Sequence, residues 1–221
     1  MATVVQISGH PGSGKTYAAA TLNPETTYMI QADKKGLPWK GWKKQYNKEN
    51  KNYAETSDVS AIYKIAKGVA DTRPEVNAIV IDTINSIMSD HEMAERKRPG
   101  FDKWSEMAGG IYDLLGLLRD IPNENLVIFV MAHVEPYEVD GETYWRTKTN
   151  GQKLTKLNLN SRLNYNLYTH VDHNPINQTN EYSLITQSNG KTEARSAHGV
   201  LPYKMPNDLE QVRKLILESE S

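Results

Sequence analysis

The chemistry of this chain begins with a glycine-rich segment near its first residues. An apolar stretch precedes the segment and a helix-forming stretch follows it, and its sequence is Gly9-His10-Pro11-Gly12-Ser13-Gly14-Lys15-Thr16. Glycines let backbone N–H groups converge on phosphate oxygens, and a helix start adds partial positive charge. Lys15 can reach the terminal phosphates, and the Thr16 hydroxyl can ligate Mg²⁺. The pattern predicts a P-loop that binds ATP through residues 9–16 and Tyr17.

A metal at such a loop needs a carboxylate at the end of a neighbouring strand. Asp82 closes the apolar run at residues 78–81 and has the form of a Walker B aspartate. We therefore predict that Asp82 and Thr16 hold Mg²⁺. Thr83 and Asn85 follow, so an ordinary helix cap is an alternative interpretation, and both roles are compatible.

Apolar strands alternate with helical segments through the first 133 residues. The predicted strands cover residues 3–8, 27–32, 78–82 and 126–132, and the predicted helices cover 16–22, 58–71, 85–96 and 103–119, with a break at Pro99-Gly100. Strands that are apolar throughout are typical of a parallel sheet covered on both faces. The predicted class is an α/β P-loop NTPase core, mainly a parallel sheet flanked by helices.

The remaining residues have a different texture. Residues 134–153 are polar without a clear period, although Asp140-Gly141 is typical of a hairpin turn. A strand pair is expected at 166–173 and 181–187, extended by 191–196, and Asn207 is expected to cap a last helix to residue 218. We predict one domain over 1–221, with a core at 1–133, a loop and β-rich extension of the sheet at 134–206, and a C-terminal helix at 207–221.

Two polar residues stand just beyond predicted strands. Asp33 follows Ala32, and His133 follows Ala132. Each also has a plain interpretation, since Asp33 lies beside two lysines and a histidine can end a strand for structural reasons.

The order of these features resembles RecA-like ATPases, and in particular the phage-encoded RecA-like nucleotide-binding proteins that include single-strand annealing ATPases. The matching pieces, which span nearly the whole chain, are residues 9–16, Ala32-Asp33-Lys34-Lys35-Gly36-Leu37, Ile79-Val80-Ile81-Asp82-Thr83, Val130-Met131-Ala132-His133, Gln187-Ser188-Asn189-Gly190-Lys191-Thr192 and Pro206-Asn207-Asp208-Leu209. The resemblance implies four catalytic residues: Lys15, Asp33, Asp82 and His133. Asp33 would position water and His133 would sense the γ-phosphate. RecA has glutamate where this chain has Asp33, which implies slow turnover.

The resemblance also implies that the segment after His133 contacts single-stranded DNA. Aromatic rings for base stacking and cations for phosphates are present there: Tyr137, Trp145, Arg146, Lys148 and Lys153. RecA-like ATPases often form rings or filaments in which a basic residue completes the neighbour's site. Lys191 and Arg195 are candidates for that role. The expected function is a slow, DNA-dependent ATPase of phage recombination or replication, with a single-strand binding protein as a further partner.

Composition sets the broad limits of this hypothesis. The chain has 221 residues, a net charge of −1, no cysteine and no apolar run of membrane-spanning length. The start lacks the pattern of a signal peptide, so we expect a cytoplasmic protein. Seven lysines against one acid occupy residues 34–51, interleaved with Trp39, Trp42 and Tyr46. This segment is either a solvated surface or a phosphate-binding patch with aromatic platforms.

Two other functions remain open at this point. A small-molecule kinase would use Arg96-Lys97-Arg98 as lid cations and would lack a hairpin past the fourth core strand. An AAA+ helicase loader would need a C-terminal helical lid with a sensor arginine, whereas the chain offers one clear helix with Arg213.

Overall fold

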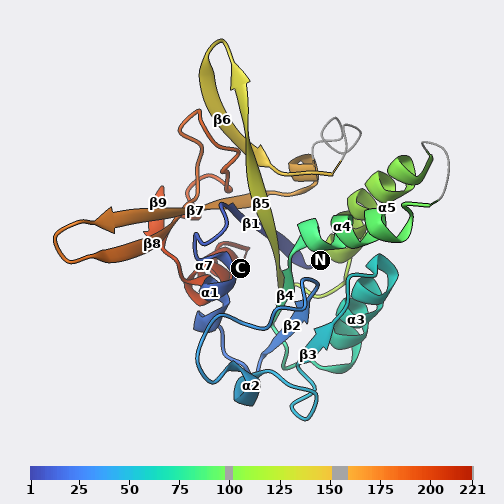
Figure 1. The fold of residues 1–221 in the computed structure, drawn as a ribbon. Helices are drawn as coiled ribbons and strands as arrows, with labels where there is room; N and C mark the ends of the chain where they lie inside the picture. The colour runs from blue at the N-terminus through green and yellow to red at the C-terminus, as the bar shows by residue number, and fades with distance from the viewer. Residues whose placement is uncertain (98–101, 151–158, 221) are drawn as a thin grey trace.

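A mainly parallel sheet forms the centre of the molecule (Figure 1). The computed structural model describes residues 1–97, 102–150 and 159–220. Within these ranges, nine strands pair in the order β3-β2-β4-β5-β1-β7-β8-β9, and β6 pairs with β5. Their bounds are β1 Thr3–Gly9, β2 Thr27–Gln31, β3 Tyr53–Glu55, β4 Ala78–Asp82, β5 Val127–Val139, β6 Glu142–Thr147, β7 Tyr165–Asn174, β8 Thr179–Ile185 and β9 Lys204–Pro206. Strands β3 to β7 along this order are parallel, and β8, β9 and β6 join antiparallel.

Helices cover both faces of the sheet (Figure 1). One face carries α3 (Val59–Thr72), α4 (Ile84–Ala94) and α5 (Asp102–Arg119), and the other carries α1 (Lys15–Ala18) and α7 (Leu209–Glu220). Alternate residues of β4 serve the two faces, since Ile79 and Ile81 pack with the first group while Ala78 and Val80 pack with the second. The predicted α/β class, a mainly parallel sheet flanked by helices, is confirmed, including the β-rich extension of the sheet beyond β1.

Aspartate side chains cap two of the helices. The Asp58 side chain accepts a hydrogen bond of 2.7 Å from Ala61 N and so caps α3. Asp208 Oδ1 accepts one of 2.9 Å from Gln211 N at the start of α7. Asn207, the predicted cap, instead donates its amide to Gly14 O at 3.0 Å. Because Asp208 accepts a hydrogen bond from the first turn of α7, the side chain of Asn207 is available for the contact with Gly14.

The structure corrects several element boundaries. The helix after the P-loop ends early, because a 3-10 turn, η1 (Ala19–Thr21), replaces its last turn. Residues 134–147 are not an irregular loop, since β5 continues to Val139 and turns at Asp140-Gly141 into β6. Residues 191–196 add only isolated bridges to the sheet. The short elements β3, β9 and α2 (Trp42–Gln45) were not predicted, and the predicted break at 99–100 lies outside the described residues.

The lysine-rich segment turns its aromatic rings inward. All seven lysines between residues 34 and 51 are exposed, whereas Tyr46 is 1% exposed and Trp39 and Trp42 are half-buried against the α1–α7 face. Tyr46 therefore cannot serve as an aromatic platform, whereas phosphate binding by this segment stays a prediction. The rings anchor the segment by apolar contact and leave a lysine-coated surface.

Buried polar groups tie the C-terminal extension to β1. Gln6 is fully buried and donates to Thr147 Oγ1 at 2.8 Å and to Asn166 Oδ1 at 3.2 Å. Asn166 donates in turn to Glu193 O at 2.9 Å. Buried polar groups need hydrogen-bond partners, so these contacts fix the positions of β6, β7 and Glu193 relative to β1. Across the described helices, no stretch has the length and apolarity that crossing a membrane requires.

The C-terminal helix can be tested as part of the core. Ile216 is fully buried in the same cluster as Ala18 and Ala19 behind the P-loop. We expect Ile216→Ala to lower the free energy of unfolding by about 2–5 kcal/mol, because it leaves a cavity. Urea titration measures the loss, with the exposed Lys214→Ala as the matched control. A loss equal to that of the control would show that α7 does not stabilise the core.

Candidate nucleotide site

The P-loop follows β1 at the carboxyl edge of the sheet and requires glycine at two points. Gly14 has φ +87°, and a Cβ there would lie 2.8 Å from the Tyr182 ring. A Cβ on Gly9 would overlap the Thr169 hydroxyl of β7. The same Thr169 hydroxyl lies 2.5 Å from Ser13 Oγ. The loop is therefore held against β7 on one side, with no space for larger residues.

Lys15 is a buried cation at the first residue of α1. Its Nζ donates to Gly9 O at 2.9 Å and to His10 O at 2.6 Å. Burial lowers the Lys15 pKa to about 8, although the charge of Asp82 opposes that shift. A phosphate chain in the loop would supply the negative partner that this ammonium group lacks.

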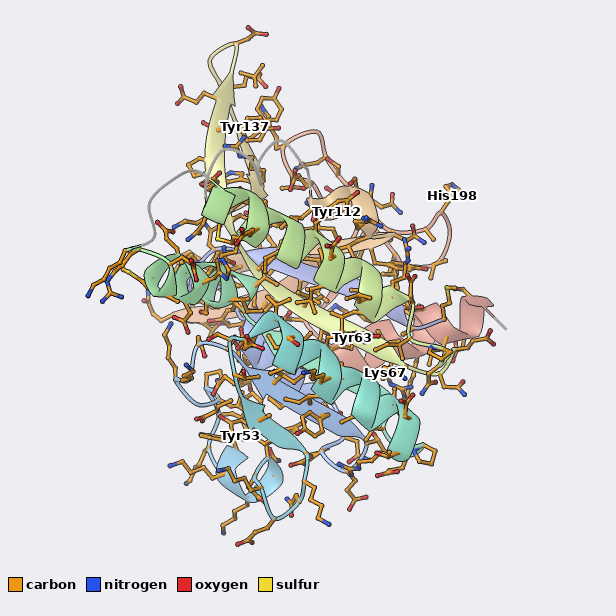
Figure 2. The ribbon with its side chains drawn as sticks, turned by 90° about the vertical axis from the view of Figure 1, so that its right-hand side faces the viewer. Tyr53, Tyr63, Lys67, Tyr112, Tyr137 and His198 are labelled. Carbon is orange, nitrogen blue, oxygen red and sulfur yellow. The ribbon has the colours of Figure 1, made fainter. Side chains whose placement is uncertain are left out.

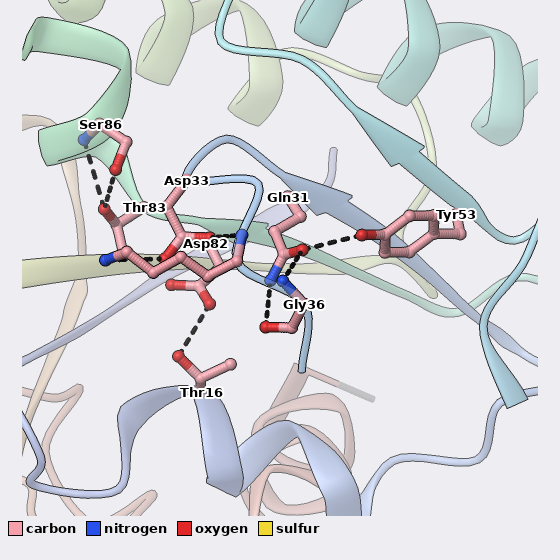
Figure 3. Close-up of polar contacts among 9 residues, drawn as sticks. Thr16, Gln31, Asp33, Gly36, Tyr53, Asp82, Thr83 and Ser86 are labelled. Carbon is pink, nitrogen blue, oxygen red and sulfur yellow. Dashed lines mark hydrogen bonds and ion pairs between the residues drawn. The ribbon is translucent and has the colours of Figure 1, made fainter. Parts of the chain in front are cut away.

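Asp82 faces the P-loop from the end of β4 (Figure 3). Thr16 Oγ1 donates to Asp82 Oδ2 at 2.8 Å. Asp82 Oδ1 is buried and has no hydrogen-bond partner among the described residues. Burial raises the Asp82 pKa to about 6, and the hydrogen bond from Thr16 counteracts part of that rise.

These groups fit a magnesium ion. A carboxylate oxygen without a partner, next to a threonine hydroxyl, suits Mg²⁺: Asp82 and Thr16 would hold the ion, and phosphate oxygens and water would complete the site. Mg²⁺, when bound, would neutralise charge on the β- and γ-phosphates.

Asp33 lies beside Asp82 on the loop after β2 (Figure 3). The backbone N–H groups of Ala32 and Asp33 both donate to Asp82 O, at 2.6 Å and 3.3 Å. Gln31 holds the far end of this loop, because its side chain accepts from Gly36 N at 2.9 Å and donates to Gly36 O at 2.7 Å. Asp33 itself pairs with Lys35 at 3.5 Å. Asp33 lines the same cavity as Asp82 in front of the P-loop.

His133 occupies the point where β5 leaves the sheet. It pairs in register with Gly9, and its backbone N–H donates to Asn85 Oδ1 at 2.7 Å. Burial, followed by the charge of Lys15, lowers the His133 pKa to about 4, so the ring is neutral at pH 7. Its Nδ1 is buried without a partner among the described residues. A neutral imidazole with one unsatisfied nitrogen can hydrogen-bond a group that enters the site.

Two adjoining cavities connect these residues. The first has a volume of about 770 Å³ and is lined by the P-loop together with Asp33, Asp82, His133, Tyr17, Asn180 and Tyr182, among others. The second, of about 570 Å³, shares Asp33, Lys35 and His133 with it and continues toward Ser89, Lys148 and Asn150. The four predicted catalytic side chains therefore border one space.

The residues predicted to contact DNA do not share one surface: they lie on both faces of the β5–β6 hairpin and at the second cavity. Tyr137 lies on the outer face of the β5–β6 hairpin (Figure 2). Arg146 lies on the same face, with its guanidinium carbon 5.1 Å from the centre of the Tyr137 ring. Trp145 lies on the inner face, 4.2 Å from the His10 ring centre. Lys148 borders the second cavity near His133. Lys153 lies outside the described residues.

The two candidate trans-acting cations are engaged within their own chain. Lys191 pairs with Glu142 and lies 5.1 Å from the centre of the Tyr144 ring. Arg195 donates to Asn160 O. Lys191 lies along the hairpin at Glu142 and Tyr144, Arg195 lies beside Asn166 of β7, and neither borders the two cavities.

Sequence reasoning missed several residues of this site. Asn85 holds the His133 backbone and also donates to Lys148 O at 2.8 Å. Thr169, Tyr182 and Asn207 contact the P-loop from the C-terminal extension. No local pattern marks them, because each reaches the loop through the pairing of distant strands.

Comparison with known proteins adds the family. Residues 1–198 match the family model AAA_24, described as an AAA domain. The chain belongs to the AAA_24 family of AAA domains. It is thus a nucleotide-binding P-loop ATPase, and such ATPases generally use nucleotide with Mg²⁺.

Similarity to individual proteins is weaker. A KaiC-like protein of Pyrococcus horikoshii OT3 aligns at 14% identity and a TM-score of 0.48, over 92% of this chain and 84% of that one. No residue role is transferred from it. No curated protein matches the chain. The predicted P-loop ATPase is confirmed, while the phage origin stays a prediction.

The lowered pKa of Lys15 predicts that the affinity of this AAA domain for ATP depends on pH. Below about pH 8 the ammonium group is charged and attracts phosphates, and above it the charge is lost. We expect the affinity for Mg²⁺–ATP to fall as pH rises through 8. Titration of a fluorescent ATP analogue from pH 7 to 9.5 measures it.

Lys15→Arg is the matched variant for that profile. Its guanidinium stays charged throughout the range, so its affinity should not fall with rising pH. If Lys15→Arg loses as much ATP affinity at alkaline pH as the intact protein does, another group causes the pH dependence.

Proposed function

We propose that this AAA domain couples ATP hydrolysis to the handling of single-stranded DNA, as an annealing or strand-handling protein in recombination or replication. The observation that carries the proposal is the path of β5. The strand pairs with β1 up to His133 and with β6 from Val134 onward. A residue at the terminal-phosphate end of the site and a projecting hairpin thus belong to one continuous strand (Figure 1).

Within the nucleotide site, we assign each residue the role that its position supports. Lys15 and the P-loop N–H groups bind the phosphates, and Thr16 and Asp82 hold the metal. Asp33 accepts a hydrogen bond from the attacking water and orients it toward the γ-phosphate. His133, being neutral, forms a hydrogen bond that depends on whether the γ-phosphate is present. The short Asp33 side chain is consistent with slow turnover.

The outer face of the hairpin has the chemistry that single strands need. Tyr137 and Tyr144 lie opposite each other, with ring centres 5.5 Å apart. Arg146 flanks the first ring and Lys191 the second. Aromatic rings stack on bases of any sequence. Arg146 and Lys191 pair with Glu135 and Glu142 in the free protein, and backbone phosphates would replace these carboxylates when a strand binds.

A second contact links the P-loop to the hairpin. Lys15 holds the His10 carbonyl, and the His10 ring packs edge-on against Trp145 of β6. When Lys15 turns to a phosphate chain, it gives up that carbonyl. We infer that nucleotide binding shifts His10 and, through Trp145, the base of the hairpin.

The two competing functions fit the structure less well. The hairpin past β5 weighs against a small-molecule kinase with a short helical lid. For a helicase loader, the described C-terminal part would need a helical lid, and it contains strands β7–β9 and the single helix α7. The same proposal includes assembly into a ring or filament, in which Lys191 and Arg195 would act on the neighbour's site. It also includes a single-strand binding protein as a partner and a cytoplasmic location in a phage-infected host.

The proposal predicts ATP hydrolysis that single-stranded DNA accelerates. Lys15→Ala should remove both basal and stimulated hydrolysis, because it deletes the phosphate-binding charge. Tyr137→Ala should weaken oligonucleotide binding about ten-fold and reduce stimulation accordingly, because one stacking platform is lost. Phosphate release and fluorescence anisotropy measure the two quantities.

Two controls sharpen this experiment. Tyr203→Ala removes an exposed tyrosine away from the hairpin and should leave DNA binding intact. Binding should also weaken steeply with added salt, because phosphate contacts release counterions. A rate that no DNA changes, or binding that neither ATP nor salt affects, would contradict the proposal.

A further inference from the structure

The β7–β8 hairpin extends past the P-loop strand. Ser8 of β1 pairs with Tyr168 of β7, so Thr169 lies level with the first P-loop residue. Strand β7 then continues to Asn174, and Tyr182 and Asn180 of β8 pair with Val171 and His173. At about 3.3 Å per residue, these two pairs lie roughly 7 and 13 Å beyond Thr169. The hairpin therefore overhangs the nucleotide site.

Alternate β8 side chains face the helix that follows the P-loop. Leu184 is buried in the same cluster as Ala18 and Ala19. Because side chains alternate along a strand, Tyr182 and Asn180 belong to the same face as Leu184. Both border the 770 Å³ cavity, and the Tyr182 ring lies against Gly14. Asn207, whose N–H donates to Tyr182 O at 3.3 Å, holds this contact from the other side.

The order of strands divides the cavity into two ends. Strand β1 and its P-loop lie in the middle, with β5 and β4 on one side and β7 and β8 on the other. The first side carries Asp82 and His133, which suit the metal and the terminal phosphate. A triphosphate held by the P-loop with its γ-phosphate toward Asp82 directs its nucleoside toward β8.

The end nearest β8 has the chemistry of a base-binding wall rather than of a phosphate site. It offers the rings of Tyr17 and Tyr182, which are 53% and 37% exposed. Asn180 lies beside them, and its Oδ1 is 2.8 Å from His173 Nδ1. When His173 donates to that oxygen, the amide N–H groups of Asn180 are left as donors.

We propose that Tyr182 and Asn180 form a nucleobase subsite, in which the Tyr182 ring stacks on the base and the Asn180 amide donates to an acceptor on the base edge. This proposal rests on the assignment of the P-loop cavity as the nucleotide site. The C-terminal extension then completes that site, and the ligand is a nucleoside triphosphate rather than an inorganic polyphosphate.

A comparison of the affinities for two ligands, one with a base and one without, tests the subsite. The affinities of ATP and of inorganic tripolyphosphate are measured for the full chain by isothermal titration calorimetry with Mg²⁺. Tyr182→Ala should weaken ATP about ten-fold or more while leaving tripolyphosphate within two-fold, because the loss concerns only the base. Tyr182→Phe keeps the ring and should retain ATP affinity.

Three further results make the outcome unambiguous. Tyr203→Ala, an exposed tyrosine outside the cavity, should change neither affinity. Lys15→Ala should weaken both ligands, and if it weakens neither, the nucleotide-site assignment itself fails. Equal weakening of both ligands by Tyr182→Ala, or unchanged ATP affinity with native thermal unfolding, would overturn the base-stacking role.

Discussion

Two buried charges at the carboxyl edge of the sheet, Lys15 and Asp82, impose the main constraint on this structure. Burial pulls their pKa values toward 8 and 6, which is the direction that favours the neutral forms. Neither group has a full set of charged partners in the protein itself: Lys15 donates to backbone carbonyls, and one Asp82 oxygen has no partner among the described residues. A Mg²⁺–triphosphate would supply the missing charge to both.

The strand order explains how other residues meet these charges. Because β5 lies between β4 and β1, His133, where β5 leaves the central sheet, lies level with the start of the P-loop. On the opposite side of β1, β7 supports the loop through Thr169 and β8 overhangs it. The core and the C-terminal extension thus meet at the P-loop, and the β5–β6 hairpin projects from the core.

Much of the centre could be predicted from the sequence. The P-loop, the Asp82 strand and the alternation of apolar strands with helices depend on residues that are close together in the sequence, so they can be recognised without the tertiary structure. The side on which Trp145 lies was not predictable, because a shift of one residue in hairpin register reverses every side chain. Elements of three or four residues, such as β3, α2 and β9, depend on distant partners. The same holds for Asn207, whose neighbour Asp208 took its expected role as a helix cap.

The central claim is that Thr16 and Asp82 hold a metal that bridges the protein and the triphosphate. Calorimetric titration of ATP with Mg²⁺ and with EDTA, for the intact protein and for Asp82→Asn, tests it most directly. The account predicts that Mg²⁺ tightens ATP binding to the intact protein and that Asp82→Asn loses this gain while keeping the metal-free affinity. Equal affinities with and without Mg²⁺, or a gain that Asp82→Asn retains in full, would contradict the account.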